Sequence, residues 1–253
     1  MKRCATKHAL HGQQTNYKVY DIHSHIIPGV DDGATSFDMS MSLIHMAHRQ
    51  GVKSIVCTSH DRYNVKKYLK SMKTLQRMVD KENLGINLYS GCEVYCTSDD
   101  MDNILVCLNK KTIPTINMTE CVLVEFSPYV YISEMIYCLK YLLDYGYIPV
   151  IAHVERYYAL HGTTQWINLL RKMGCLFQVN AYSFVDESNG KIKKFARTLL
   201  KDRYISFIGS DAHRTNHRPY SIKNGIDYIY TNCDEKYAKD ICYRNANNML
   251  NIK

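Results

Sequence analysis

The chain has 253 residues, of which 46% are hydrophobic and 22% are charged, and its formal net charge is +8. This composition is typical of a globular protein and excludes a disordered chain, and no apolar run approaches the roughly 18 residues that span a bilayer. The lysines are scattered, so we interpret the positive charge as a surface that favours anionic substrates, and we expect no nucleic-acid partner and no membrane insertion.

Seven short runs of β-branched or aromatic residues recur along the chain, and segments with helical patterns separate them. Most of these runs are continuously apolar, as expected for parallel strands that are buried on both faces. The predicted strands cover residues 18–22, 54–58, 86–90, 121–126, 148–152, 175–179 and 204–208.

The intervening segments carry helix signals. Thr35 to Asp38 resembles a capping box, apolar residues follow at helical spacing, and Gly51 stands where a C-terminal cap belongs. Further helices are predicted at residues 66–83, 99–109, 132–145, 163–173, 190–202 and 236–250. Alternating strands and helices without a Gly/Pro-rich linker predict an α/β fold with one closed or nearly closed barrel. Residues 1–17 are expected to be a poorly ordered N-terminal extension.

Polar residues stand at the C-terminal ends of six of the seven predicted strands. In a β/α barrel these ends converge on one face, where active sites are built. The candidate groups are His23, His25, Asp31 or Asp32, His60, Glu93, Glu125, His153, Asp211 and His213.

His23 and His25 lie two residues apart on an extended segment, so their side chains point the same way and can bind one cation. Mixed imidazole and carboxylate ligands suit zinc, manganese or iron and fit calcium poorly. The candidates outnumber the ligands of a single ion, which favours two or three ions bridged by a carboxylate, with Glu93 as the expected bridge.

Two of the assignments leave alternatives. An Asp before Gly is commonly a turn residue, so Asp31 rivals Asp32 as a ligand, and we favour Asp32. Glu125 interrupts an apolar run, and burial of an unpaired carboxylate is costly, which favours a functional role. His45, His48 and His161 lack a strand-end context and receive no role.

The motifs resemble one known family. The segment from Asp21 to Gly33, which reads DIHSHIIPGVDDG, is similar to the opening signature of the polymerase and histidinol phosphatase (PHP) superfamily, and especially to bacterial CpsB/CapC-type protein-tyrosine phosphatases of capsule and exopolysaccharide operons. Further similar segments follow in family order at residues 58–60, 91–95, 124–126, 150–157 and 209–213.

The resemblance implies a distorted (β/α)7 barrel of the PHP type over residues 18–253, with a multinuclear site of the manganese type. It implies phosphotyrosine protein as the substrate, notably the tyrosine-rich tail of a partner bacterial tyrosine kinase, and a role in capsule synthesis. The implied metal ligands are His23, His25, Asp32, His60, Glu93, Glu125, His153, Asp211 and His213. Arg156 matches the phosphate-binding arginine of the family, and Arg218 matches a second one.

The sequence also has to be compared with three other classes of protein. Cysteine-based tyrosine phosphatases need a cysteine with an arginine six residues later, and none of the ten cysteines has one. Several cysteines lie in apolar runs, so we expect reduced thiols in a reducing, cytoplasmic compartment. A small-molecule phosphatase, such as a histidinol-phosphate phosphatase, and a non-catalytic metal-binding module are the remaining alternatives.

Overall fold

The structure, a computed structural model, describes residues 17–60 and 64–252. Apart from Tyr17, the extension predicted at the N-terminus therefore lies outside the described residues. The described part of the chain forms eight strands, and every strand pair is parallel. The strands are β1 (Val19–Ser24), β2 (Val52–Cys57), β3 (Asn87–Ser90), β4 (Glu93–Tyr95), β5 (Cys121–Glu125), β6 (Ile148–Ile151), β7 (Leu176–Asn180) and β8 (Phe207–Gly209).

Strands β3 and β4 are two halves of one strand position. β2 pairs with β3 up to Cys57 and Ser90, and a parallel bridge between His60 and Glu93 then continues the pairing onto β4. Gly91 lies at the break, and a Cβ atom there would stand 2.8 Å from Cγ1 of Val56, so only glycine fits. The extra strand was not predicted, but it adds no position to the barrel.

The barrel closes between β1 and β8. Ser24 forms a parallel bridge with Ala212, and the backbone N–H of His25 donates to the carbonyl of Ala212 at 2.8 Å. The N–H of Asp211 donates to the carbonyl of His23, also at 2.8 Å. With β3 and β4 sharing one position, the eight strands occupy seven positions, which confirms the expected distorted (β/α)7 barrel.

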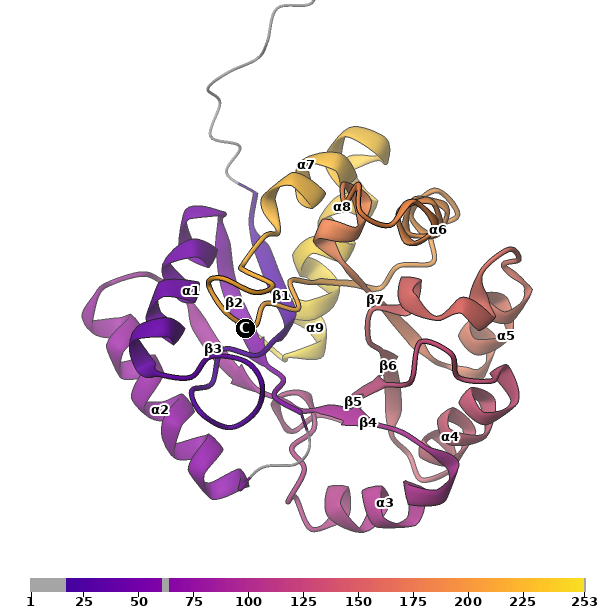
Figure 1. Ribbon diagram of the computed structural model, residues 1–253, viewed down its shortest axis with the longest axis horizontal. Helices are drawn as coiled ribbons and strands as arrows, with labels where there is room; N and C mark the ends of the chain where they lie inside the picture. The colour runs from indigo at the N-terminus through magenta and orange to yellow at the C-terminus, as the bar shows by residue number, and fades with distance from the viewer. Residues whose placement is uncertain (1–16, 61–63, 253) are drawn as a thin grey trace, which may run out of the picture.

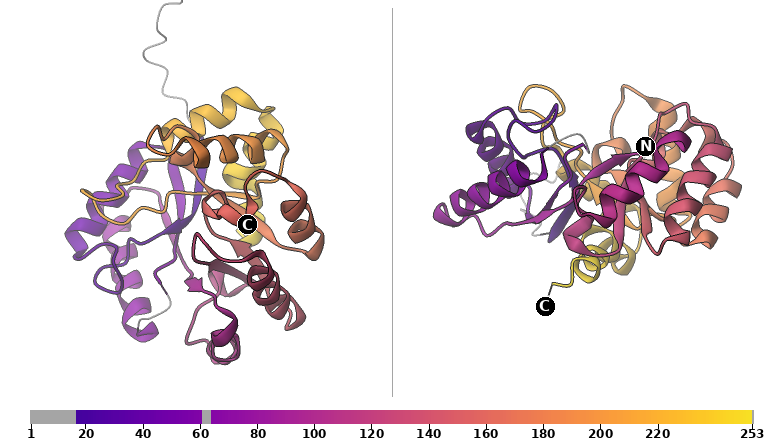
Figure 2. Two further views of the ribbon diagram at one scale, coloured as in Figure 1. Left: turned by 45° about the vertical axis from the view of Figure 1, so that its right-hand side comes forward. Right: turned by 90° about the horizontal axis from the view of Figure 1, so that it is seen from below.

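Helices surround the strands (Figures 1 and 2). The helix α7 (Lys223–Asn232) was not predicted, because its apolar residues are few and Gly225 lies in its first turn. The single helix predicted for residues 236–250 is instead α8, a π-helical turn at Asp240–Arg244 and α9. The helices are α1 (Phe37–Arg49), α2 (Val65–Lys81), α3 (Met101–Asn109), α4 (Ile132–Asp144), α5 (Gln165–Met173), α6 (Gly190–Lys201), α7 (Lys223–Asn232), α8 (Glu235–Lys239) and α9 (Asn245–Met249).

The start of α1 differs slightly from the prediction. Its N-cap is Ser36, whose side chain accepts from the N–H of Met39 at 3.2 Å, so the capping box expected from Thr35 to Asp38 was wrong by one residue. Gly51 follows the C-cap in a left-handed conformation with φ of +85°, as a C-terminal stop signal requires.

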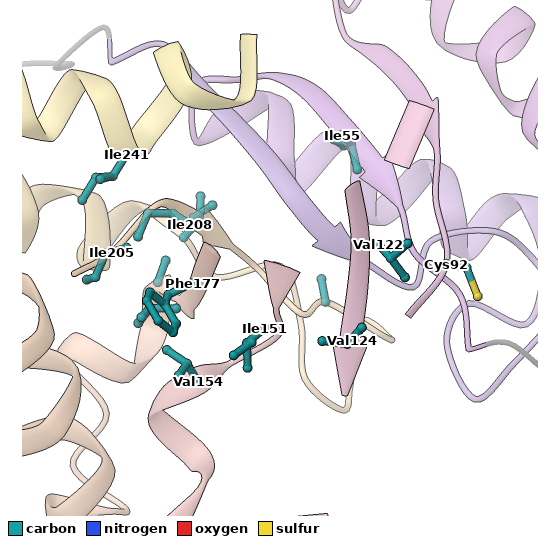
Figure 3. Close-up of a cluster of buried hydrophobic side chains, with 14 of the residues drawn as sticks. Ile55, Cys92, Val122, Val124, Ile151, Val154, Phe177, Ile205, Ile208 and Ile241 are labelled. Atoms are coloured by element: carbon teal, nitrogen blue, oxygen red, sulfur yellow. The ribbon is translucent and has the colours of Figure 1, made fainter. Parts of the chain in front are cut away.

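The strands are apolar on both faces because each face packs against a different layer. In β5, Val122 and Val124 face the layer between strands and helices, which Figure 3 shows, whereas Leu123 lies in a second cluster with Ile22 and Val150. Ala246 and Leu250 from the C-terminal helical segment join this second cluster. Burial on both faces explains the continuous apolar runs of the sequence.

Candidate metal centre

The carboxyl ends of the strands bring the candidate ligands to one end of the barrel. His23 lies within β1, Glu93 begins β4 and Glu125 ends β5. The other groups come from the loops that directly follow strands or, for Asp32, from the longer loop after β1, and they are His25, Asp32, His60, His153, Asp211 and His213. Each of the nine lies within 4 Å of at least one other member.

Glu93 lies at the centre of this cluster. Its Oε2 atom lies 3.2 Å from Nε2 of His23, 3.1 Å from Nε2 of His25 and 3.4 Å from Nδ1 of His60. Its Oε1 atom lies 3.0 Å from Nε2 of His153, and the side chain is almost fully buried. A carboxylate with two oxygens directed at different imidazoles has the geometry of a bridging ligand.

The candidate ligands include three sets of donor atoms, and within each set all the atoms lie within 4.8 Å of one another. His25, His60 and Glu93 each belong to two of the three sets, so the sets describe neighbouring positions that two or three ions can occupy. The sets are His23, His25 and Glu93; His60, Glu93 and Glu125; and His25, Asp32, His60 and His213.

Asp211 and His153 belong to the cluster, and both have a backbone conformation with positive φ. Oδ1 of Asp211 lies 3.7 Å from Nε2 of both His23 and His25. Nε2 of His153 lies 3.4 Å from Oε1 of Glu125. Asp211 has φ of +53° and His153 has φ of +30°, a region that non-glycine residues seldom adopt and that is concentrated at functional sites.

His213 shows that these residues fit a divalent cation. Its Nδ1 atom lies 2.9 Å from the carbonyl oxygen of Asp211, which fixes a tautomer with a lone pair on Nε2. That Nε2 atom is buried and has no hydrogen-bond partner among the described residues, although Oδ1 of Asp32 lies 3.4 Å away. Burial and the nearby His25 lower the pKa of His213 to about 2, so the imidazole is neutral, as a metal ligand must be.

The two candidate aspartates have different surroundings. The side chain of Asp31 is 3% exposed, and its Oδ2 atom lies 2.8 Å from Nδ1 of His25 and accepts from the N–H of His60 at 3.1 Å. Asp32 is exposed to solvent and lies against the imidazoles of His60 and His213. Asp31 therefore holds the imidazole of His25 from behind, while Asp32, on the open side of the cluster, stays the predicted ligand.

Two further orienting residues were missed in the sequence. Oε1 of Gln178 lies 3.0 Å from Nδ1 of His23 and accepts from the N–H of His153 at 2.8 Å. Nε2 of Gln178 donates to Oδ1 of Asn180 at 2.8 Å, and Nδ2 of Asn180 donates to Oδ2 of Asp211 at 3.1 Å. Both side chains are fully buried and lie two residues apart in β7, so they point to the same face of the strand. Two polar residues that alternate with apolar ones in this strand could have indicated their role from the sequence.

Arg156 reaches the edge of the cluster. Its Nη2 atom lies 2.7 Å from Oδ2 of Asp211 and donates to the hydroxyl of Tyr182, and 22% of its side chain is exposed. The carboxylate of the neighbouring Glu155 accepts from the N–H of Asn180 at 3.0 Å and from the hydroxyl of Ser183 at 2.7 Å. The guanidinium is therefore held beside the candidate ligands with one side open.

Arg218 approaches the same carboxylates from another loop. Its Nη1 atom lies 3.5 Å from Oδ1 of Asp211, and its Nη2 atom lies 3.2 Å from Oδ2 of Asp32. Although burial alone would raise the pKa of Asp211, Arg156 and the nearby imidazoles hold this pKa below its usual range. Two guanidinium groups thus flank the cluster, as binding of a phosphoryl group would require.

A parallel β/α barrel with imidazoles and carboxylates clustered at its carboxyl end defines a metal-dependent barrel hydrolase. The family model described as "Capsular polysaccharide synthesis, CpsB/CapC" matches residues 19–251. The chain belongs to the CpsB/CapC family.

Named relatives extend this result. The chain is 32% identical to "Tyrosine-protein phosphatase CpsB" of Streptococcus agalactiae serotype V over 240 residues, which cover 91% of this chain and 97% of that protein. It is 28% identical to "Tyrosine-protein phosphatase YwqE" of Bacillus subtilis over 81% of this chain and 82% of that protein.

Solved structures agree with the fold. One comes from a study of YwqE from Bacillus subtilis and CpsB from Streptococcus pneumoniae, described as "unique metal-dependent tyrosine phosphatases". It superposes on this chain with a TM-score of 0.79 at 25% identity, and the match covers 92% of this chain and 94% of that chain. Histidinol phosphate phosphatase of Lactococcus lactis shares the fold with a TM-score of 0.57 at 14% identity, over 84% of this chain and 92% of that chain.

No helix in the described part of the chain is long and apolar enough to cross a membrane.

Proposed function

We propose that the protein is a metal-dependent protein-tyrosine phosphatase that regulates capsule or exopolysaccharide synthesis. The observation that carries the proposal is Glu93, which contacts four imidazoles while Arg156 and Arg218 flank the same cluster. The relatives named as tyrosine-protein phosphatases cover nearly the whole chain, which supports the same reaction.

The proposed cofactor is a set of two or three divalent transition-metal ions, with manganese favoured over iron or zinc. The ligands are the nine clustered residues, whose mix of imidazole and carboxylate suits these metals. Ions bound here would lower the pKa of coordinated water and offset charge on phosphoryl oxygens.

The residues of the chain divide the remaining work. Arg156 presents a planar fork with several donors, which suits bidentate contact with a phosphoryl group. Its contacts with Asp211 and Tyr182 fix the guanidinium before substrate arrives, so little reorganisation is needed. Arg218 is proposed as a second phosphoryl contact.

No cysteine is needed for this reaction. Cys57, the last residue of β2, is fully buried, and burial raises the pKa of its thiol. Burial also raises the pKa of Cys138 to about 12. A thiolate nucleophile requires the opposite shift.

The proposed substrate is phosphotyrosine on a protein, in particular the tyrosine-rich tail of a partner bacterial tyrosine kinase, and the proposed location is the cytoplasm. The alternative is a small phosphate monoester such as histidinol phosphate, which the shared fold of the Lactococcus lactis enzyme keeps under consideration. A non-catalytic metal-binding module is disfavoured, because both the ligand set and the arginines are present.

Turnover of the two substrate classes distinguishes these functions. With manganese, kcat/KM for a phosphotyrosine peptide is expected to exceed kcat/KM for histidinol phosphate by about 10²-fold. A tyrosine phosphatase stabilises the transition state partly through contacts with the phenyl ring and the peptide, which histidinol phosphate lacks. Steady-state phosphate release with both substrates measures the ratio. A preference for histidinol phosphate would overturn the proposal, and absence of turnover of either in metal-loaded protein would support the non-catalytic module.

A further inference from the structure

Four aromatic rings form a row at the rim of the barrel. Tyr129 stacks on Tyr158 with a ring-centroid separation of 5.3 Å, Tyr158 contacts His161 at 5.4 Å, and His161 contacts Phe195 at 4.6 Å. The N–H of Tyr158 donates to the carbonyl of Pro128 at 3.1 Å, which ties the two loops that carry the tyrosines together.

One end of this aromatic row adjoins the candidate active site. Tyr129 lies in the loop that follows Glu125, and Tyr158 comes two residues after Arg156. Tyr129 is 77% exposed and Tyr158 is 39% exposed, so these rings do not serve the core. Exposed aromatic side chains beside a catalytic centre offer contact area to a bound chain at low entropic cost.

The other end of the aromatic row lies in a hollow of about 600 Å³ beside α6. His161 and Phe195 line this hollow, which the 161–164 loop borders on one side and α6 on the other. Thr163, Thr164, Lys191 and Lys194 also line it.

The hollow is positively charged. Lys191 and Lys194 are exposed and form no ion pair with any described residue, whereas the neighbouring Lys193 pairs with Glu187. Helix α6 has no acidic residue, so nothing on it offsets the two ammonium groups. A site with unpaired ammonium groups, hydroxyls and an aromatic wall fits a carboxylate-bearing peptide segment.

We propose that the aromatic row and this lysine-lined hollow bind the peptide that flanks the phosphotyrosine, with an acidic side chain of the peptide in the hollow at Lys191 and Lys194. The inference rests on the proposed phosphatase function and adds a preference for acidic residues on one side of the target tyrosine. The row runs without a gap from Tyr129, in the loop that follows Glu125, to the hollow.

The test uses the manganese-loaded protein and two synthetic phosphotyrosine peptides that differ only in flanking Glu or Gln residues. The paired substitution Lys191→Ala and Lys194→Ala is expected to raise KM for the Glu peptide about 5- to 10-fold at low salt, with kcat unchanged, because exposed charge pairs contribute modestly. KM for the Gln peptide and kinetics with p-nitrophenyl phosphate should stay within twofold. The difference between peptides should shrink at about 0.5 M salt.

A matched control removes the same charge elsewhere. Lys70→Ala with Lys73→Ala changes two exposed lysines of α2, which lies across the barrel from α6 (Figure 1), and it should leave both peptides unaffected. An equal rise in KM for the Gln peptide, or no change for the Glu peptide, would overturn the inference. If the wild-type protein fails to hydrolyse either peptide, the proposed function fails, and binding of the Glu and Gln peptides, measured by fluorescence anisotropy, still tests the hollow.

Discussion

Replacing Glu93 by glutamine is expected to lower kcat/KM for a phosphotyrosine peptide by at least about 10³-fold, equivalent to about 4 kcal/mol of transition-state stabilisation. Glu93 contacts the imidazoles of His23, His25, His60 and His153, so its charge serves more than one metal position. Glutamine keeps the size of the side chain but removes the charge that holds neighbouring cations together, and groups that act as a unit fail together.

Metal content and kinetics measured on the same preparation test this prediction. The Glu93→Gln protein should bind less metal than the wild type under equal loading, while its far-UV circular dichroism is unchanged. Glu120→Gln is the matched control, because Glu120 is exposed just before β5 and lies outside the cluster. A folded Glu93→Gln protein with normal metal content and wild-type turnover would show that Glu93 is no bridging ligand.

Replacing Arg156 by alanine is expected to reduce kcat/KM by roughly 10²–10³-fold, by analogy with loss of one preorganised donor. The guanidinium lies 2.7 Å from Asp211 and is partly open to solvent, so it can hold a phosphoryl group without itself being a metal ligand. Metal content should therefore stay at the wild-type level. Arg156→Lys should restore only part of the activity, because an ammonium group is a point charge without the planar fork.

The control for this prediction is Arg77→Ala, which removes an exposed arginine from α2. Its kinetics should match those of the wild type. Near wild-type kinetics for Arg156→Ala would reduce Arg156 to a structural partner of Asp211. Loss of activity together with loss of metal would likewise contradict the assigned role, because it would mean that Arg156 acts through the metal ligands.

The sequence predicted the barrel and the clustered groups because both depend on local patterns and one topological rule. Continuous apolar runs indicated buried parallel strands, and parallel strands place their carboxyl ends on one face. The two-residue spacing of His23 and His25 correctly predicted that their side chains point the same way, since their Nε2 atoms lie 3.2 Å apart. Asp31 and Asp32 both lie beside clustered imidazoles, so the choice of Asp32 as the ligand stays a prediction, and the contact of Asp31 with His25 was not foreseen.

Features that depend on long-range packing were missed. The break between β3 and β4 arises from the close approach of Gly91 to Val56, which no local pattern reveals. The contact of Arg156 with Asp211 and Tyr182 joins residues that are 55 and 26 positions apart, and it depends on how two loops cross the end of the barrel. His161 received no role because its surroundings come from α6, which is remote in sequence.

The proposed function requires that metal ions held by the nine clustered residues support phosphatase activity. The direct test is to measure bound metals by mass spectrometry and phosphotyrosine-peptide hydrolysis on one sample before chelation, after chelation and after addition of manganese. We predict more than one metal equivalent per chain at the start, loss of activity when the metals are removed, and recovery with manganese. Full activity in a sample shown to contain no metal would contradict the account.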